Sequence, residues 1–436
     1  MSLIGKFIDQ ILPVGSITIV GADRKRDTYG PGGGGNVTVK LHDKRAAFDL
    51  FRNPRLKLGE LYMDQRLTIE DGGTILDLLE LIVGAKPWEE GRRKALGKGK
   101  AGKLKSLFRR NPVKKSRSNV AHHYDIGNDL YALFLDDDLQ YSCAYFTDPK
   151  NSLEHAQADK KAHIAAKLDL KPGQRVLDIG CGWGGMALYL HKVAGVDVLG
   201  VTLSEEQLKI ARQRAEDAGV ADHVKFELID YRQLDGRFDR IVSVGMFEHV
   251  GAAHYDEFYA KCRELLTDDG VMLLHTIGKL GGAGTPDPFT DKWIFPGYHL
   301  PSLSQMCGSS EKVKMIVSDV ETLRLHYAYT LRHWLQRATK ARAKIVKMYD
   351  ERFFRMWEFY LAGGIVMFES GAACNYQVQY VRDRRATPIT RDYMLETERK
   401  YREIATAATA PRTRPRSASS KTTLETTGPK RAASVP

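Results

Sequence analysis

Cysteine is scarce in this chain, with 5 among 436 residues and no paired spacing. This scatter argues against a disulfide scaffold or a zinc site and fits a reducing cytoplasm, so we expect a cytoplasmic protein without a metal. No apolar run reaches the ~18 residues that a membrane-spanning helix needs. Lys6, Asp9 and Gln10 interrupt the apolar start of the chain, which excludes a secretory signal there.

Acidic residues are absent from one long segment. Residues 91–117 contain twelve Lys or Arg and no Asp or Glu, which equals the net charge of +12 of the whole chain. Such a run attracts an anionic surface, either phospholipid or nucleic acid, although composition alone favours a solvated, disordered linker at least as much. Leu104, Leu107 and Phe108 fall at helical spacing among the basic residues, a pattern that interfacial membrane binding explains. We therefore expect a phospholipid membrane surface as partner and no nucleic acid, because the run lacks an interleaving of aromatic residues suited to base stacking.

The rest of the chain shows a regular alternation of strands and helices. Strands are predicted at 176–179, 197–201, 224–229, 240–244 and 271–275, with helical patterns between them. This alternation indicates an α/β fold with a doubly wound, mostly parallel sheet that binds ligands at the carboxyl ends of its strands.

Four regions are predicted along the chain. Residues 1–90 form a small N-terminal α/β domain, 91–118 a basic linker, 119–405 the catalytic domain and 406–436 a disordered tail. Beyond Met315 we expect mainly helices, at 331–348 and 353–369, and a final strand at 377–381.

A glycine-rich turn follows the first of these strands, in the stretch Val176-Leu177-Asp178-Ile179-Gly180-Cys181-Gly182-Trp183-Gly184-Gly185. Glycines Gly180, Gly182 and Gly184 let a ligand come close to uncovered N–H groups at a helix start. An ordinary strand–turn–helix unit is the simpler alternative. The acid Asp178 stands two places before the first glycine, which suits S-adenosylmethionine (SAM), whose amino-acid cation a carboxylate helps to hold. Asp230, Tyr231 and Arg232 follow a later strand and are predicted to hold and flank the adenine, with a simple turn as the alternative for Asp230.

Several motifs together resemble the cyclopropane-fatty-acyl-phospholipid synthase family, in its long bacterial form, over roughly residues 119–395. The matching segments, in the order of the family, are 123–128, 141–143, 176–185, 200–204 with Gln207, 245–251, 275–278, 294–297 and 326–331. The resemblance implies a seven-stranded class I SAM-methyltransferase fold, with helical additions over the active site and a lipid-binding-like N-terminal domain. It also implies methyl transfer from SAM to the cis double bond of a phospholipid acyl chain, and then proton loss that closes a cyclopropane ring.

The resemblance assigns further residues. Tyr141 and Ser142 would close over SAM, with core packing as the alternative for Tyr141. Thr202, Leu203 and Gln207 would stand where other SAM enzymes use an acid. Family members hold a bicarbonate ion that acts as the base. Its ligands here would be Cys143, Glu248, His275, the backbone of Ile277, and Tyr327. Because Glu248 and His275 are predicted to end neighbouring strands, we expect both in one crevice. A core histidine and a buried small thiol are the alternatives for His275 and Cys143.

Aromatic residues are a weaker part of the interpretation. Tyr145, Phe146, Phe247, Trp293 and Tyr298 are candidates for a wall that tolerates a cation, although core packing also explains them.

The chain departs from the family at one position. Gly364 stands where many members carry a late-helix cysteine that has been proposed as catalytic. Either the thiol is dispensable, or the product differs, so a fatty-acyl C-methyltransferase giving a methyl or methylene branch stays open. A soluble small-molecule SAM methyltransferase is a further alternative. The resemblance also implies peripheral association with the inner membrane and a homodimer.

Overall fold

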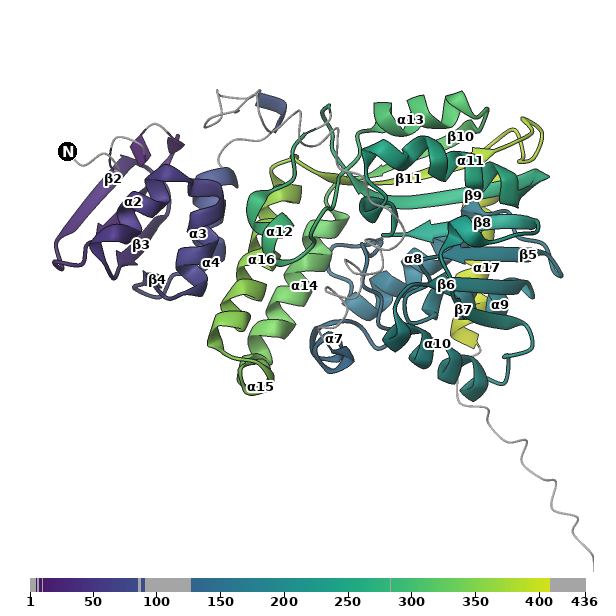
Figure 1. Cartoon of the computed structure of the whole chain (residues 1–436), viewed down its shortest axis with the longest axis horizontal. Coiled ribbons are helices and arrows are strands. Elements are labelled where there is room, and N and C mark those ends of the chain that lie inside the picture. Colours follow the sequence, from purple (N-terminus) through teal and green to yellow (C-terminus); the bar gives the residue numbers. More distant parts are fainter. Residues whose placement is uncertain are drawn as a thin grey trace, which may run out of the picture.

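The computed structural model describes residues 5, 8–9, 11–84, 88–90, 127–282 and 284–407. The basic linker predicted at 91–118 and the tail beyond residue 407 lie outside the described residues. Residues 406 and 407, which were assigned to the tail, instead end the last helix. Two sheets organise the chain, a small one near the N-terminus and a large one in the catalytic part (Figure 1).

The N-terminal unit, as far as the structure describes it, packs α-helices on a four-stranded sheet. Its strands are β1 (Gly15–Val20), β2 (Arg26–Gly32), β3 (Asn36–Leu41) and β4 (Leu67–Glu70), in the order β2-β1-β3-β4. The helices are α2 (Lys44–Arg52), α3 (Pro54–Met63) and α4 (Ile75–Leu79). Helix α2 begins at Asp43, whose side chain accepts from the Ala46 N–H, and α4 begins with a capping box of Thr74 and Asp77. The small α/β arrangement therefore follows from local signals.

The large sheet has seven strands in the order β10-β11-β9-β8-β5-β6-β7. Strands β5 to β9 run parallel, and β11 is antiparallel to both of its neighbours. This confirms the doubly wound, mostly parallel fold. The bounds are β5 (Arg175–Ile179), β6 (Asp197–Thr202), β7 (Val224–Leu228), β8 (Phe238–Val244), β9 (Leu266–Gly278), β10 (Ile316–Leu323) and β11 (Cys374–Val381).

Two elements depart from the predicted pattern after Met315. The region was expected to be mainly helical, yet β10 is a strand at the edge of the large sheet. Ser318, Asp319 and Glu321 give it a polar pattern, because an edge strand pairs on one side only and stays partly in solvent. The helix expected at 331–348 is two helices, α14 (His326–Lys340) and α15 (Arg342–Met348).

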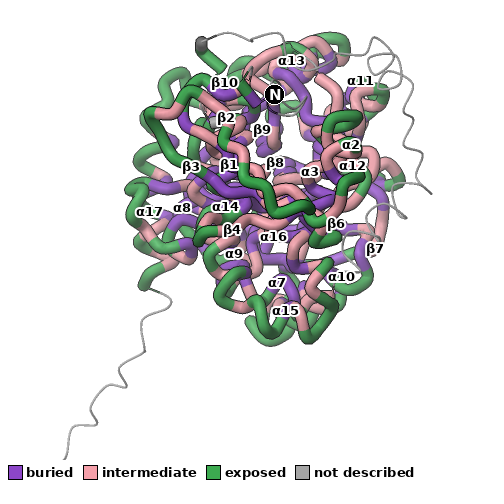
Figure 2. The backbone as a smooth tube through the Cα atoms, turned by 90° about the vertical axis from the view of Figure 1, so that its left-hand side faces the viewer, coloured by how far each residue is buried: buried purple, intermediate pink, exposed green. Residues whose placement is uncertain are grey.

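Helices cover the large sheet and link it to the N-terminal unit. In Figure 1, α14 and α16 (Glu351–Glu369) stand between the two sheets, and α3 and α4 pack against α16. Figure 2 views the molecule from the N-terminal side, where exposed parts of the N-terminal unit cross in front of mostly buried segments and further exposed segments lie along the rim. The remaining helices are α7 (Asn128–Phe134), α8 (Leu153–Lys167), α9 (Gly185–Ala194), α10 (Glu205–Asp217), α11 (Tyr255–Leu265), α12 (Pro288–Trp293), α13 (Leu303–Lys312), α17 (Asp392–Ala407) and the short turns η1 (Glu80–Gly84), η2 (Trp88–Glu90), η3 (Tyr231–Gln233), η4 (Phe247–His249) and η5 (Ala252–His254).

Candidate active site

The glycine turn after β5 is built from left-handed residues. Gly180 and Gly182 have φ of +82° and +55°, and a Cβ on Gly182 would meet no atom within 4 Å, so its open side faces a pocket. Gly184 also has a φ of +82°, but a Cβ there would lie 2.6 Å from the Phe226 ring. It does not line the pocket. Gly184 was predicted to let the backbone approach the cofactor. In the structure it stands apart from the pocket lining and lets the start of α9 pack closely on β7.

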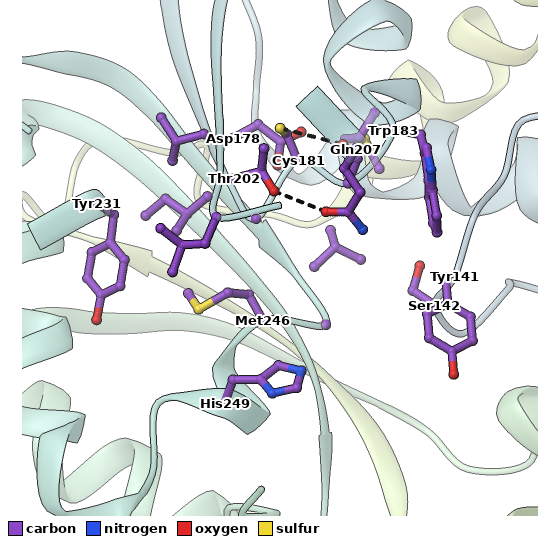
Figure 3. Close-up of a pocket in the computed structure, with 18 of the residues that line it drawn as sticks. Tyr141, Ser142, Asp178, Cys181, Trp183, Thr202, Gln207, Tyr231, Met246 and His249 are labelled. Carbon is purple, nitrogen blue, oxygen red and sulfur yellow. Dashed lines mark hydrogen bonds between the residues drawn. The ribbon is translucent and has the colours of Figure 1, made fainter. Parts of the chain in front are cut away.

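A pocket of about 150 Å³ lies at the carboxyl ends of β5, β6 and β8 (Figure 3). We name it the cofactor pocket. The Thr202 hydroxyl donates to Gln207 Oε1 at 3.0 Å, which fixes both side chains at its wall. The structure brings together here the other residues predicted to bind SAM: Tyr141, Ser142, Asp178, Gly180, Gly182, Thr202, Leu203, Gln207, Asp230, Tyr231 and Arg232.

Asp178 is the one acidic side chain at the base of the glycine turn. It is 1% exposed, and its Oδ2 atom has no hydrogen-bond partner among the described residues. Burial raises the pKa of this carboxyl from 3.8 to about 7. A buried carboxylate without a partner is unfavourable unless a cation arrives, and the amino group of SAM is such a cation. The residues present therefore fit SAM.

Asp230 lies at the cofactor pocket and is also a turn residue. It lines the cofactor pocket, and its side chain caps η3 by accepting from the backbone N–H of Arg232. The Arg232 guanidinium binds the same carboxylate, with Nη2 2.7 Å from Oδ2. The turn alternative is thus confirmed for Asp230, its role toward adenine stays a prediction, and the Arg232 guanidinium pairs with Asp230.

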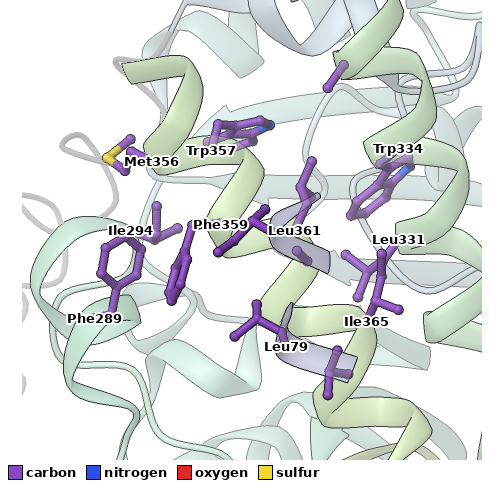
Figure 4. Packing of buried hydrophobic residues seen from close by; sticks show 14 of the residues in the cluster. Leu79, Phe289, Ile294, Leu331, Trp334, Met356, Trp357, Phe359, Leu361 and Ile365 are labelled. Atoms are coloured by element: carbon purple, nitrogen blue, oxygen red, sulfur yellow. The ribbon is translucent and has the colours of Figure 1, made fainter. Parts of the chain in front are cut away.

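A second cavity, of about 790 Å³ and mainly apolar, adjoins the cofactor pocket. We name it the acyl cavity. It extends from the N-terminal unit, past α4, α14 and α16, to β9; Figure 4 shows Leu79, Phe289, Leu331 and Phe359 of its walls. All five residues predicted to hold bicarbonate line it: Cys143, Glu248, His275, Ile277 and Tyr327. The two cavities share Tyr141, Ser142, Gly245 and His249, so they meet at these residues.

Glu248 and His275 share the acyl cavity, but neither ends a strand as predicted. Strand β8 stops at Val244 and Glu248 lies in the turn η4, whereas β9 continues beyond His275 to Gly278. Glu248 Oε1 accepts from the Ile277 N–H at 2.6 Å, and its Oε2 atom is buried without a partner among the described residues. Burial raises the pKa of this carboxyl to about 7, although the Ile277 N–H favours the charged form. The backbone group predicted to bind bicarbonate is thus held by Glu248.

Two amides on β11 decide which nitrogen of His275 carries the proton. Gln377 Oε1 accepts from the Lys167 ammonium at 2.8 Å, so its Nε2 must donate to His275 Nδ1, 3.1 Å away. Burial and the nearby cations lower the pKa of His275 well below 6.5, so the ring is neutral and has one N–H, on Nε2. The Asn375 side-chain amide lies against this N–H, with Nδ2 placed 2.8 Å from His275 Nε2. Because two donors cannot pair, the amide must be turned so that Oδ1 accepts from Nε2–H, which also gives the otherwise unpartnered Oδ1 a donor. The sequence interpretation missed both amides.

Helix α8 holds the segment that crosses the junction of the cavities. Lys160 is fully buried and donates to Gln140 Oε1 at 2.5 Å and to the Ser142 hydroxyl at 2.8 Å. Gln157 donates to the carbonyls of Gln140 and Ser142 at 3.2 and 3.0 Å. Burial lowers the pKa of Lys160 to about 8 and raises that of the Cys143 thiol, which stays protonated. Gln157 and Lys160 stand at i and i+3 on a helix that was predicted, and this spacing was the available sequence signal for them.

The aromatic wall is made of other residues than those predicted. Of the five candidates, only Tyr298 lines the acyl cavity. Tyr145 stacks on His163 and His326, with centroid distances of 4.0 and 5.0 Å, and Phe247 packs on Tyr255 in the core. Other aromatic residues that line the acyl cavity include Tyr141, Phe289, Phe295, Tyr327, Phe359 and Tyr360.

His249 is a further residue at the junction that the sequence interpretation left out. It lines both cavities, and burial lowers its pKa to about 4, so its ring is neutral at physiological pH. Its position directly after Glu248, in a turn that follows a strand end, was a usable signal.

Comparisons with known proteins agree on one family. Residues 112–378 match the family model described as mycolic acid cyclopropane synthetase. The chain is 44% identical over 276 residues to the cyclopropane-fatty-acyl-phospholipid synthase of Escherichia coli K12, over 63% of this chain and 71% of that protein. It is 42% identical over 271 residues to the "Probable fatty acid methyltransferase" of Pseudomonas putida, over 60% and 68%. Among solved structures, it is similar to the mycolic acid cyclopropane synthase CmaA1 complexed with SAH and CTAB, with a TM-score of 0.58 and 34% identity over 61% of this chain and 97% of that chain.

Proposed function

Because the chain belongs to the mycolic acid cyclopropane synthetase family, we propose that it acts on the cis double bond of an unsaturated phospholipid acyl chain and closes a cyclopropane ring there. The chain is a SAM-dependent C-methyltransferase. The observation that carries the proposal is the junction of the two cavities at Tyr141, Ser142, Gly245 and His249. A donor held in one cavity and an apolar chain held in the other would meet at this point.

Bound SAM would supply the methyl group. Asp178 would bind its amino-acid end, Gly180 and Gly182 leave room for the backbone to approach it, and the Thr202–Gln207 pair and Asp230 would hold the nucleoside end. Lys160 and Gln157 fix the segment that carries Tyr141 and Ser142 between donor and acyl chain. Positioning of this kind contributes strongly to rate, because the reacting atoms must lie in near-attack geometry.

The acyl cavity suits a cationic intermediate. Methyl transfer leaves a carbocation on the acyl chain, and loss of one proton from the transferred methyl carbon lets that C–H electron pair close the ring. The mainly apolar lining keeps water away from the cation, and the rings of Tyr141, Tyr327 and Tyr360 offer π faces to it. The neutral ring of His249 adds no repulsive charge.

Bicarbonate is proposed as the base that takes this proton. The buried and unpartnered Oε2 of Glu248, the side-chain N–H of Asn375 and the hydroxyl of Tyr327 belong to residues that line the acyl cavity, and they fit a small anion with a hydroxyl group. His275 would act through Asn375, because its Nε2–H holds the Asn375 oxygen and turns the amide N–H to the cavity. With its pKa near 7, Glu248 is able to donate to the anion when it is protonated. The Ile277 N–H would join these donors only when Glu248 releases it.

A fatty-acyl C-methyltransferase with a methyl or methylene product is the second candidate. The Pseudomonas putida relative carries such a name, and Gly364 lines the acyl cavity where the family's cysteine would stand. The two candidates share the same methyl transfer and differ in the fate of the cation. Loss of a methyl proton from the first cation closes the ring, whereas a methylene branch forms when a 1,2-hydride shift moves the cation to the methyl-bearing carbon before the methyl group loses a proton. Loss of the proton on the methyl-bearing carbon gives a methyl-branched alkene.

We also propose that the enzyme acts at the inner face of the membrane, in contact with anionic phospholipid and as a possible homodimer. The basic and apolar residues within 91–117 motivate the lipid contact. In the part of the chain that the structure describes, no helix combines the length and the apolar character needed to cross a bilayer.

One assay separates these candidates. The protein is incubated with SAM, bicarbonate and vesicles of an unsaturated phospholipid, and the acyl chains are then analysed by mass spectrometry and for their double bonds. A gain of one CH₂ with loss of the double bond supports ring closure, and a gain of CH₂ with a retained double bond supports the methylene product. A chain of unchanged mass would refute both.

A further inference from the structure

Helix α2 places two phenylalanine side chains in solvent. Phe48 is 61% exposed and Phe51 is 53% exposed, although α2 buries Ala46 on its other side. Phe48, Phe51 and Arg52 follow one another at i, i+3 and i+4, so they share one side of the helix. Aromatic and basic residues on one exposed helix face are typical of helices that lie in a membrane interface.

The same place is the mouth of the acyl cavity. Phe51 and the exposed Arg55 line the cavity, and so do Val83 and Trp88, which are 39% and 44% exposed. Of the exposed large apolar residues described in this unit, Phe51, Val83 and Trp88 line the cavity, and Phe48 lies one helical turn from Phe51. Exposed apolar residues that gather at a cavity indicate a binding surface, whereas scattered ones do not. Figure 2 looks onto this unit, where α2 lies against α3.

The charges around α2 favour an anionic partner. Its acid Asp49 and the neighbouring Asp43 both pair with Arg66, at 3.0 and 2.8 Å. Lys44 and Arg52 form no ion pair among the described residues, and their charges remain available. Basic side chains beside an apolar face match a leaflet that contains anionic phospholipid.

The mouth is fixed relative to the catalytic residues. The Trp88 N–H donates to the Ser370 carbonyl at 2.8 Å, and Arg55 lies 3.7 Å from Asp287. Helix α3, which follows α2 directly, packs on α16. An acyl chain that enters at α2 would thus reach the junction through apolar walls, without exposing its methylene groups to water.

We propose that the side of α2 bearing Phe48, Phe51 and Arg52 docks on an anionic phospholipid bilayer and sets the mouth of the acyl cavity against it. This docking face rests on the proposed function, because a cavity for acyl chains needs a route from the leaflet. Phe48 does not line the cavity, so it serves docking without touching the bound chain.

The test compares Phe48→Glu with Leu395→Glu. Leu395 is 58% exposed, close to the 61% of Phe48, and belongs to α17, so the control adds the same charge at a similarly exposed leucine away from the cavity. Binding is measured by co-sedimentation with unsaturated phosphatidylcholine vesicles that contain phosphatidylglycerol. Turnover is measured on these vesicles and on a short-chain unsaturated phospholipid kept monomeric in solution. Circular dichroism and SAM affinity check that both variants are folded.

Phe48→Glu is expected to weaken vesicle binding and vesicle turnover by about tenfold or more relative to Leu395→Glu, with turnover of the monomeric lipid unchanged. Arg52→Gln is expected to reduce the preference for vesicles with phosphatidylglycerol over vesicles of phosphatidylcholine alone. Equal vesicle binding by the two Glu variants would overturn the docking face. A wild-type dimer that Phe48→Glu converts to a monomer would also overturn it, because a second copy would then cover α2. If the wild type methylates neither lipid, the proposed function fails, and co-sedimentation still decides the docking face.

Discussion

Replacing Gln377 by glutamate should reverse the proton position on His275. In the wild type, Gln377 Oε1 is held by Lys167, and its Nε2 donates to His275 Nδ1 at 3.1 Å. A carboxylate of the same shape has no N–H to donate and must accept from Nδ1–H instead. The His275 Nε2 atom then becomes an acceptor, and Asn375 must donate to it, so that Oδ1 of Asn375 is left toward the cavity. One isosteric substitution therefore turns His275 Nε2 from a donor into an acceptor and makes Asn375 present its acceptor oxygen, instead of an N–H donor, to the acyl cavity.

The size of the effect follows from the hydrogen bond that an anion in the acyl cavity would lose. A hydrogen bond to a charged group contributes about 1.5–3 kcal/mol, and each 1.4 kcal/mol corresponds to about a factor of ten. We therefore expect Gln377→Glu to raise the bicarbonate concentration needed for half-maximal activity by roughly 10- to 100-fold. SAM affinity should be unchanged, because Gln377 does not line the cofactor pocket.

The tautomer is read directly by ¹⁵N NMR of protein labelled at histidine, with His275→Asn used to assign the signal. Gln379→Glu is the matched control: it lies on the same face of β11, and its side chain bonds the Lys167 carbonyl and the Tyr393 hydroxyl rather than His275. Gln377→Glu should move the His275 proton to Nδ1, and Gln379→Glu should leave it on Nε2. A proton that stays on Nε2, or a ring that becomes cationic, would contradict the reasoning.

Three further predictions concern the carboxyl groups and the late-helix glycine. Since burial raises the pKa of Asp178 to about 7, SAM should bind about tenfold more weakly at pH 6 than at pH 8, and Asp178→Asn should remove this dependence in calorimetric titrations. Ionisation of Asp178 destabilises the ligand-free folded state only at pH values above the unfolded pKa of 3.8. The free energy of unfolding of Asp178→Asn, measured with urea, should therefore exceed that of the wild type by up to ~4 kcal/mol at pH 8 and by almost nothing near pH 4. Glu248→Gln should lower kcat by about 100-fold or more with SAM affinity retained, and near-normal turnover would exclude Glu248 from proton transfer. In Gly364→Cys the new Cβ would lie 3.0 Å from the movable end of Leu331, so we expect a folded enzyme with activity within about threefold of wild type, whereas a rise of tenfold or more would show that the thiol is catalytic.

The parallel part of the fold was predictable because its signals are local. A β-branched run, a glycine turn and a helix pattern recur along residues 176–275, and each unit forms with its neighbours in sequence. Strand β10 was not predictable in this way. In the described sheet it is an edge strand that pairs with β11, a segment more than fifty residues later in the sequence, and Ile316 lies opposite Val381. Its polar residues interrupt the alternation of apolar and polar residues that marks a strand. Gly184 shows the same limit in the site, since only the position of Phe226 reveals that it serves packing.

The sequence by itself determined the methyl donor and the family, because Asp178 and its glycines form one short segment and the matching motifs keep their order along the chain. The tertiary structure decided the proton position on His275 and the path of the acyl cavity. His275 receives its proton position from Gln377, about a hundred residues away on an antiparallel strand, and the acyl cavity joins α2 to Glu248 across most of the described chain. Such contacts depend on which strands pair and which helices pack, and these long-range choices leave no periodicity in the sequence from which to read them.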